Sequence, residues 1–277
     1  MRRTHSFLIS IAMFLAVGPP IVSAQGDTLP SVSVGRQLCC DGMTMVKGAA
    51  FVFTAPARWE GGDWMRAGGT LLLTGGSALM DGGVEEFMDR NRSNTADNLE
   101  KFTVKYAEGV TIVGVSAGLY AIGLIFSDRW IRETGLLTGT AVAVCGAIST
   151  VSKIIVGRAR PYAGLGNHEF RPFTVEDSFH SFPSGHTVAA FALSTVLASR
   201  IDNPWASVGL YTLAAASSVS RIYSRNHWFS DVVFSAILST SASRSLLRWY
   251  DGVEDHAASH GLEVLPCAGG VAIVWRF

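Results

Sequence analysis

The stretch Leu136-Leu-Thr-Gly-Thr-Ala-Val-Ala-Val-Cys-Gly-Ala-Ile-Ser-Thr-Val-Ser-Lys-Ile-Ile-Val156 shows the pattern that decides the fold. It is apolar or small almost throughout, carries a single charge at Lys153, and lacks the alternation of a half-buried strand. Five further runs are similar: Trp64 to Met80, Val110 to Phe126, His186 to Ser199, Ala206 to Ser220 and Ser230 to Trp249. We therefore predict an all-α fold, a helical bundle of about six core helices.

These runs are rich in Gly, Ala, Ser and Thr, which suits close helix packing in water and in lipid alike. Thr134 to Ser152 and Asn203 to Ser220 carry no charge and come near the length that spans a bilayer, but neither is densely hydrophobic. The pattern favours a soluble or membrane-surface bundle, with an integral membrane form as the alternative.

The N-terminus has the three-part layout of a secretory signal peptide. Met1-Arg2-Arg3 precedes an apolar run from Phe7 to Val17, and Val22-Ser-Ala24 follows. We predict cleavage after Ala24 and export to the periplasm. A retained anchor helix is the alternative, although the run is short for a span and Gly18-Pro19-Pro20 interrupts it.

The rest of the chain is predicted to comprise an N-terminal arm (25–63), one helical domain (64–250) and a C-terminal tail (251–277). The arm suggests no chemistry. In the tail, Val264 to Phe277 is predicted to form a strand or a docked segment.

Charge and cysteine usage narrow the possible functions. The 22 basic and 22 acidic residues balance, so the basic excess typical of nucleic-acid-binding proteins is absent. Export would place the cysteines in an oxidising compartment, where a disulfide from Cys39 or Cys40 to Cys267 is one hypothesis. Cys145 lies in an apolar run and no C-x-x-C spacing occurs, so we expect no metal site.

Three blocks carry candidate chemistry. In Lys153-Ile-Ile-Val-Gly-Arg-Ala-Arg160-Pro161, two cations emerge near one helix end, a pattern that the helix dipole also favours without any ligand. In Ser181-Phe-Pro-Ser184-Gly185-His186-Thr187, Gly185 lets a ligand approach free N–H groups at a helix start, which is typical of an anion site. A simple serine cap followed by a surface histidine explains the second block equally well.

The third block is Ser220-Arg221-Ile-Tyr-Ser-Arg-Asn-His227-Trp-Phe-Ser-Asp231. His227 and Asp231 lie four residues apart, so on a helix they would share a face and the carboxylate could accept a proton from the imidazole. This would leave the other ring nitrogen free to attack an electrophile. Taken alone, such pairs are more often structural than catalytic.

The three blocks together favour a bound anion. Lys153, Arg160 and Arg221 each border an apolar run, and cations drawn into a helical core are costly without partners. A phosphate would satisfy all three cations and the helix start at once.

The spacings Lys-x6-Arg-Pro, Pro-Ser-Gly-His and Ser-Arg-x5-His-x3-Asp resemble the three-part signature of the type 2 phosphatidic acid phosphatase superfamily. All eleven specified positions match, and with its supporting helices the resemblance covers about 110–249. It implies a fold like that of the acid phosphatases and vanadium haloperoxidases, and a phosphatase domain at 64–250.

The resemblance also implies the roles of the residues. His227 would attack phosphorus, Asp231 would orient His227, and His186 would protonate the leaving oxygen as general acid. Phosphate-binding groups are implied at Lys153, Arg160, Ser184, the backbone N–H of Gly185, and Arg221. Arg158 misses the lysine spacing, so no role is expected for it. The reaction is expected to need no metal and no cofactor.

We therefore expect a phosphatase that acts through a phosphohistidine on a phosphomonoester or diphosphate of a lipid, with possible membrane association. A water-soluble phosphate ester is the nearest alternative substrate. Two further hypotheses are a vanadium-dependent haloperoxidase, with vanadate as cofactor in the same pocket, and a non-catalytic envelope module.

Overall fold

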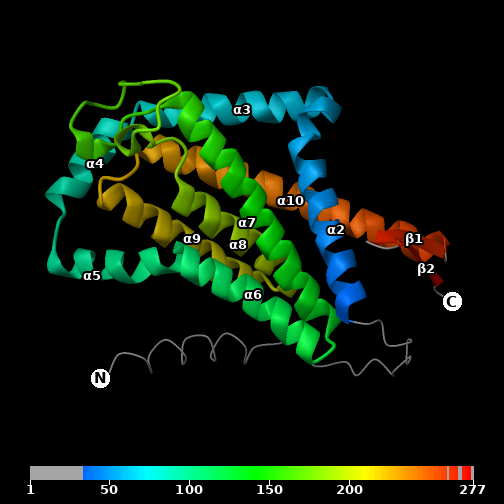
Figure 1. Ribbon diagram of the computed structural model, residues 1–277. Helices are drawn as coiled ribbons and strands as arrows, with labels where there is room; N and C mark the ends of the chain where they lie inside the picture. The colour runs from blue at the N-terminus through cyan, green and yellow to red at the C-terminus, as the bar shows by residue number, and fades with distance from the viewer. Residues whose placement is uncertain (1–33, 261, 268–269, 276–277) are drawn as a thin grey trace. The chain divides into compact units, whose positions relative to one another are not determined.

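The computed structural model describes residues 34–260, 262–267 and 270–275, with side chains through residue 255 (Figure 1). In chain order the elements are α2 (Val34–Phe53), η1 (Ala55–Arg58), α3 (Gly61–Ala78), α4 (Asp81–Arg90), α5 (Asn94–Thr103), η2 (Val104–Ala107), α6 (Gly109–Ile125), α7 (Arg129–Val156), η3 (Pro161–Ala163), η4 (Asp177–Phe179), α8 (Gly185–Ile201), α9 (Pro204–Tyr223), α10 (Phe229–His260), β1 (Leu262–Cys267) and β2 (Gly270–Trp275). Contacts divide the chain into residues 1–37 and 38–277, and the bundle lies in the second unit. The six predicted runs fall in α3 and in α6 to α10, so the all-α bundle is confirmed.

Polar side chains start the helices that carry the site. Asp128, Ser184 and Asn203 precede α7, α8 and α9, and each side chain accepts a backbone N–H from the first turn of its helix. Each cap satisfies a donor that the helix start would leave unpaired.

The end of α7 depends on Gly157. Gly157 has a φ of 58°, and its N–H donates to the backbone oxygen of Lys153. A Cβ at this position would lie 1.8 Å from the backbone oxygen of Arg171, so only glycine fits. The chain therefore turns sharply into the loop that carries Arg158 and Arg160.

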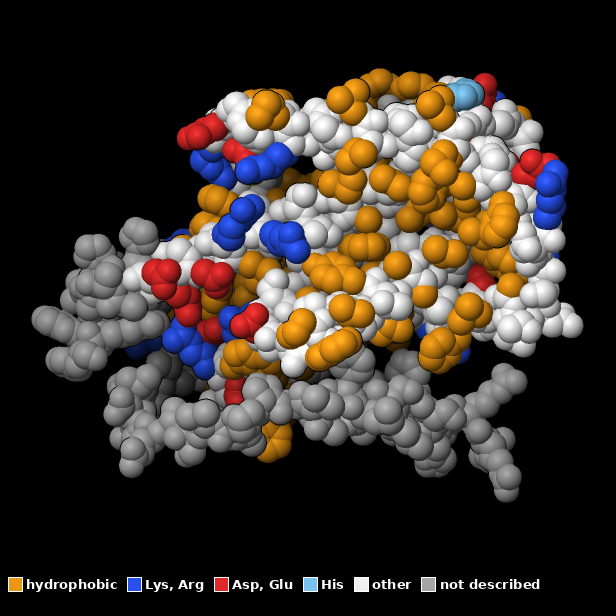
Figure 2. All heavy atoms as spheres, turned by 180° about the vertical axis from the view of Figure 1, so that it is seen from behind, with side chains coloured by type: hydrophobic (Ala, Val, Ile, Leu, Met, Phe, Trp, Pro, Cys, Tyr) orange, Lys and Arg blue, Asp and Glu red, His pale blue; other side chains and the backbone are white. Residues whose placement is uncertain are grey.

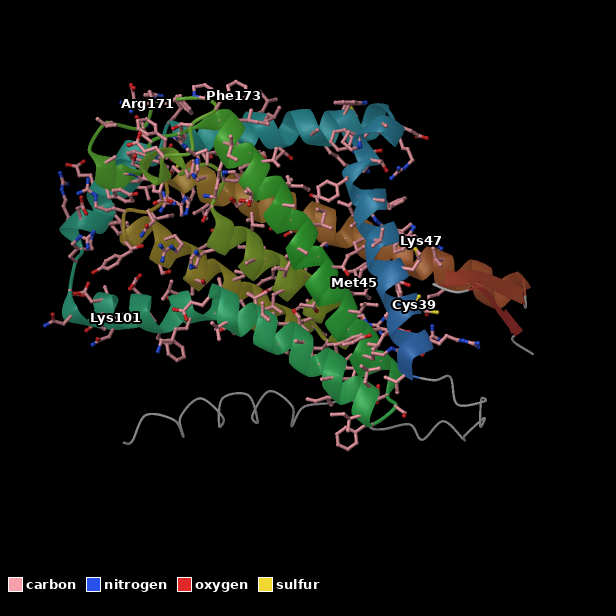
Figure 3. All side chains as sticks on the ribbon, in the orientation of Figure 1. Cys39, Met45, Lys47, Lys101, Arg171 and Phe173 are labelled. Atoms are coloured by element: carbon pink, nitrogen blue, oxygen red, sulfur yellow. The ribbon has the colours of Figure 1, made fainter. Side chains whose placement is uncertain are left out.

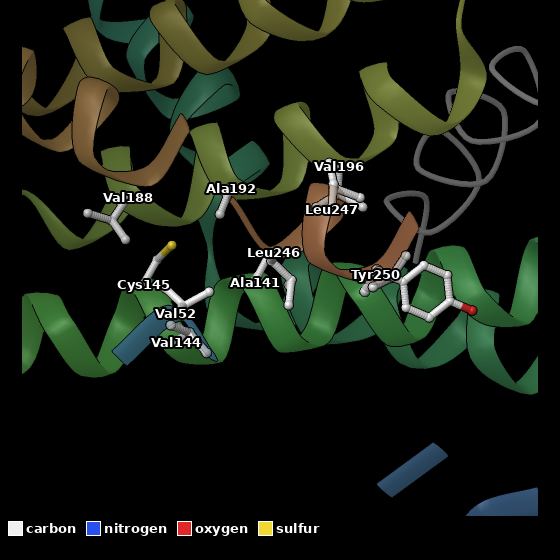
Figure 4. Close-up of a cluster of buried hydrophobic side chains, with 11 residues drawn as sticks. Val52, Ala141, Val144, Cys145, Val188, Ala192, Val196, Leu246, Leu247 and Tyr250 are labelled. Atoms are coloured by element: carbon white, nitrogen blue, oxygen red, sulfur yellow. The ribbon is translucent and has the colours of Figure 1, made fainter. Parts of the chain in front are cut away.

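The hydrophobic core lies where α7, α8 and α10 pack together, with Val52 of α2 against them (Figure 4). Its other buried members are Leu137, Ala141, Val144, Cys145, Val188, Ala192, Val196, Leu246, Leu247 and Tyr250. On α10, Ser235, Ser239 and Ser243 are fully buried at four-residue spacing, so small side chains face the neighbouring helices. This confirms the expected close packing through small residues.

Several elements differ from the sequence-based prediction. The predicted arm contains α2, whose Asp41 is buried, accepts a hydrogen bond from Tyr120 and pairs with Arg132. α3 begins at Gly61, ahead of the predicted boundary, and α10 continues past residue 250 to His260. In the tail, the strand that was one of the two predicted forms is present, within an antiparallel hairpin in which Leu262 pairs with Trp275.

Two predictions lie outside the described residues. The predicted signal peptide and its cleavage site precede residue 34, and the side chain of Cys267 is not described. The disulfide to Cys267 therefore stays a prediction, while Cys145 is buried and makes no disulfide.

The surface carries many large hydrophobic side chains. Leu72 on α3, Val110 on α6 and Trp205 on α9 are each about four-fifths exposed or more, at 79%, 85% and 82%. Figure 2 shows such side chains spread over the face that it presents. By length and composition α7 could cross a membrane, and so could α5 to α6 if the bent pair forms one span.

Candidate active site

The three blocks come together at one end of the bundle, where α7 and α9 end and α8 and α10 begin (Figure 1). The loop between α7 and α8, in which Figure 3 labels Arg171 and Phe173, lies at this end. Lys153 reaches from the last turn of α7, and its Nζ donates to the backbone oxygen of His180 at 2.6 Å. A Cβ on Gly185 would lie 3.9 Å from Cε of Lys153, so the first two blocks are in contact.

Arg160 and Arg221 each present a buried Nε that has no hydrogen-bond partner among the described residues. Arg160 is otherwise held by Asn226 at 3.2 Å and by Asp177 at 2.9 Å. No side-chain hydrogen bond or ion pair is formed by Arg221 within that part of the chain. Buried guanidinium donors without acceptors are costly, so this arrangement indicates a place for an anion.

His186 lies in the first turn of α8, where its imidazole is exposed to the positive charges of three cations. Burial and the positive charges of Arg221, Lys153 and Arg160 lower the pKa of His186 from 6.5 to about 4. Burial is the main reason that the pKa of His227 lies well below its usual value, and the same three cations lower this pKa further. The positive charges of Lys153, Arg160 and Arg221 therefore act on both imidazoles.

The ring of His227 is oriented by a backbone carbonyl. Its Nδ1 lies 2.6 Å from the backbone oxygen of Ser181, and the side chain is only 4% exposed. A carbonyl can only accept, so Nδ1 carries the proton and the lone pair is on Nε2. His227 is thus in the tautomer that an attacking imidazole needs.

The predicted hydrogen bond between His227 and Asp231 is not formed. α10 begins at Phe229, so His227 precedes the helix, and Oδ2 of Asp231 lies 3.9 Å from Nδ1, beyond hydrogen-bond distance. Oδ2 instead accepts from the Ser181 hydroxyl at 2.5 Å and from the Trp228 N–H at 2.9 Å. Asp231 therefore holds Trp228, which follows His227 in the chain. It also holds Ser181, whose backbone oxygen accepts the hydrogen bond from His227.

Arg158, for which no role was expected, is the charge partner of Asp231. Its guanidinium is 4% exposed and donates to Asp231 Oδ1 at 2.6 Å, to Asp81 Oδ2 at 2.7 Å and to the Ser230 hydroxyl at 2.8 Å. Asp81, at the start of α4, also accepts from the Ser230 N–H at 2.8 Å. Residue spacing could not reveal this role, because it tests Arg158 only as a phosphate-binding residue, whereas its partners lie inside the protein.

Sequence reasoning also missed Asp81 and Ser181. No spacing rule connects Asp81 with Arg158, since 77 residues separate them. The only signal in the sequence was a carboxylate at the junction between two helical segments.

Ser184 caps α8 as predicted, and its position limits its possible role in phosphate binding. The side chain is fully buried and accepts from Thr187 through both the backbone N–H and the hydroxyl. Its backbone N–H donates to the Ser235 hydroxyl at 2.8 Å. Gly185 follows as the first helical residue, so its backbone N–H is one of the donors at the helix start.

Together these groups form a site suited to phosphoryl transfer. One imidazole has a free Nε2, and a second imidazole makes no hydrogen bond within the described part of the chain. Three cations and a helix start supply positive charge for the oxygens of a tetrahedral anion.

The segment that carries the site is similar to known proteins. Residues 134–254 match the model of the PAP2 superfamily. A lipid A 1-phosphatase of Porphyromonas gingivalis is 36% identical over 97 residues, which is 34% of this chain and 19% of the relative. A lipid A 1-phosphatase of Rhizobium etli is 33% identical over 106 residues, 38% of this chain and 45% of the relative. This chain thus matches less than half of the length of either relative.

A solved structure supports the fold. The first transmembrane PAP2 type phosphatidylglycerolphosphate phosphatase from Bacillus subtilis aligns with 79% of this chain and 97% of its own, at a TM-score of 0.51 and 15% identity. The segment that matches the PAP2 superfamily, residues 134–254, includes all eight predicted site residues.

Proposed function

We propose that this protein is a phosphatase that hydrolyses a phosphate ester or diphosphate through a phosphohistidine at His227. The observation that carries the proposal is the arrangement of the site. Arg160 and Arg221 each have a buried Nε without a partner among the described residues, Lys153 lies against the start of α8, and Nδ1 of His227 is held by the Ser181 carbonyl, which leaves Nε2 free. The proposed reaction uses no metal.

The first step transfers the phosphoryl group to the enzyme. Nε2 of His227 forms a bond to phosphorus while the bond from phosphorus to the leaving oxygen breaks, and His186 gives that oxygen a proton. His186 must be protonated to do this, and the negative charge of the bound phosphate raises its pKa by offsetting the three cations. The arginines and the lysine stabilise the charge on the transferring group.

The second step releases phosphate. Water forms a bond to phosphorus, the phosphorus–nitrogen bond breaks, and His186 takes the proton from the water. The sum of both steps is one ester and one water converted to one alcohol and one phosphate, with the enzyme restored.

A lipid phosphate is the proposed substrate. Both curated relatives are named lipid A 1-phosphatase, and the loop beside the site exposes apolar side chains such as Phe173 at 76% and Val175 at 84% (Figure 3). Exposed apolar side chains at the mouth of a phosphate site suit a lipid surface better than a free sugar phosphate. We also propose that the protein is exported and works at the membrane facing the periplasm.

The substrate proposal is tested by comparing kcat/KM for a long-chain lipid phosphate with kcat/KM for p-nitrophenyl phosphate. The double substitution Phe173→Ser with Val175→Ser should lower turnover of the lipid and leave the soluble ester unchanged. Preference for the soluble ester, with no effect of the loop substitutions, would instead make this a water-soluble-substrate phosphatase. Retention of the protein until detergent is added, rather than release by osmotic shock, tests the membrane location.

A further inference from the structure

A large apolar groove runs between α3 and α10. It has a volume of about 1520 Å³ and is closed on one side by the end of α2 and by η1. Apolar residues from each element line it, among them Trp64 and Leu71 of α3 and Ile237 and Leu238 of α10. Trp64 is 56% exposed and Leu71 is 63% exposed, so an apolar surface is open to a ligand here.

Four arginines share this apolar groove: Arg58, Arg66, Arg244 and Arg248. Arg244 and Arg248 are exposed, stand one helical turn apart on α10, and make no hydrogen bond or ion pair within the described part of the chain. Arg58 donates only to neutral oxygens, those of Thr54 and Phe51. The positive charge on the walls of the groove is therefore largely unbalanced.

The groove also contains little negative charge. Asp63 is the single carboxylate that lines it, and this side chain is already bound to Arg66 at 2.9 Å. Asp63 also accepts the backbone N–H of Glu60 at 3.3 Å. A ligand that fills the groove must accordingly combine a negative charge with an apolar body.

The arginines lie near one end of the groove. Arg58 stacks over the Phe51 ring at 4.3 Å, and Phe51 stacks on Trp249, the residue after Arg248, at 6.0 Å. The other end is marked by Phe234, whose ring lies 4.6 Å from that of Phe182, next to the active site. Figure 2 shows a group of Lys and Arg side chains beside exposed hydrophobic ones on the face that it presents.

This arginine cluster is too far away to serve the reaction. Arg248 follows Asp231 by seventeen positions on one helix, which corresponds to about 25 Å. An anion held at Arg244 and Arg248 therefore cannot be the phosphate that His227 attacks.

We propose that the groove between α3 and α10 binds an anionic phospholipid that is not turned over. Its headgroup phosphate lies at Arg244 and Arg248, with Arg58 and Arg66 nearby, and its acyl chains lie along the apolar walls. Guanidinium groups bind phosphate through paired, charge-assisted hydrogen bonds, and the chains gain free energy by leaving water. The proposed lipid binding does not depend on the catalytic role of His227.

Trp59 and Trp64 make the proposal measurable, because their rings are in contact at 4.9 Å and both line the groove, together with Trp249. The full-length protein in a non-ionic detergent is titrated with phosphatidylglycerol that carries brominated acyl chains, and quenching of tryptophan fluorescence is followed. The expected result is saturable quenching. Brominated phosphatidylcholine, which has no net charge, should quench only at much higher concentration.

The variant Arg244→Gln with Arg248→Gln should raise the half-saturating concentration of phosphatidylglycerol by about tenfold or more. The matched control Lys101→Gln with Lys105→Gln removes two exposed charges at the same spacing from α5 and η2, where Figure 3 labels Lys101, and should leave it unchanged. Both variants should hydrolyse p-nitrophenyl phosphate like the wild type, which verifies folding. Equal quenching by both lipids, an equal effect of both variants, or no quenching at all would overturn the proposal. The last result would mean that another partner covers the groove.

Discussion

The Nδ1 atom of His227 lies 2.6 Å from the backbone oxygen of Ser181, whereas the nearest oxygen of Asp231 is 3.9 Å away. The carboxylate instead receives the hydroxyl of Ser181 and the N–H of Trp228. Asp231 thus fixes both the residue that orients the ring and the residue that follows it. In this site the carboxylate acts on the nucleophile through its neighbours.

Ser181 has two functions: its backbone oxygen orients the ring of His227, and its hydroxyl donates to Asp231. Ser181→Ala removes only the second. The backbone acceptor of His227 remains, but Asp231 loses a buried donor, so we expect the free energy of unfolding to fall by about 1–3 kcal/mol. We also expect kcat to fall while KM stays nearly constant, because the cations that bind phosphate are untouched. Unfolding curves and steady-state kinetics on p-nitrophenyl phosphate measure both, and a change confined to KM would contradict this account.

His227→Ala should abolish turnover, because no other imidazole in the site has its Nε2 set for attack by a backbone acceptor. Asp231→Asn should reduce turnover strongly, since it removes the charge that Arg158 and Ser181 hold in place. His168→Ala is the control, because that side chain is exposed in the loop and should not matter. Initial rates of phosphate release are measured, and substantial activity in purified His227→Ala would rule out the mechanism.

Asp81→Asn tests the buried ion pair beneath the site. Arg158 keeps its ion pair with Asp231, but it loses the charged acceptor at Asp81, as does the Ser230 N–H, so we expect a loss of about 1–3 kcal/mol in the free energy of unfolding. Asp89→Asn is the matched control on the same helix, because its ion pair with Arg92 is partly exposed and contributes about 0–1 kcal/mol. Chemical unfolding followed by circular dichroism distinguishes the two, and equal effects would show that the buried pair is not special.

Acidification should destabilise the protein through the two site histidines. The pKa of His186 is about 4 in the folded protein and about 6.5 in the unfolded chain, so the unfolded state binds more protons between these values. The contribution of neutral His186 to the free energy of unfolding is therefore complete above about pH 6.5 and is lost as pH falls toward about 4. His186→Asn should reduce the drop in melting temperature between pH 7 and pH 4.5. An unchanged drop would show that the folded His186 is not held neutral by the cations.

The sequence was sufficient to predict the elements that carry the site. The apolar runs located α3 and α6 to α10, because burial imposes its pattern directly on the sequence. It did not reveal α4 and α5, whose mean hydrophobic content is low, nor the helical character of the arm. It placed His227 on a helix, but the carboxylate of Asp231 accepts the Trp228 N–H and starts α10 two residues later.

The missed contacts share one physical cause. Arg158 is bound by Asp81 from a helix 77 residues away, and the acceptor of His227 is a backbone oxygen, which has no residue type. Neither interaction leaves a spacing pattern, so only the folded chain reveals them. The candidate cations Lys153, Arg160 and Arg221 could be inferred because charges at the ends of apolar runs are visible in the sequence itself.

The most direct test of the central claim is to stop the reaction of the purified enzyme with a ³²P-labelled substrate in alkali and to locate the label by mass spectrometry. The account predicts an acid-labile, alkali-stable phosphoramidate on His227 alone. It also predicts that the label accumulates in His186→Ala when a phosphate with a good leaving group is used, since water then lacks its base. A label on another residue, or turnover with no covalent phosphate at any time, would contradict it.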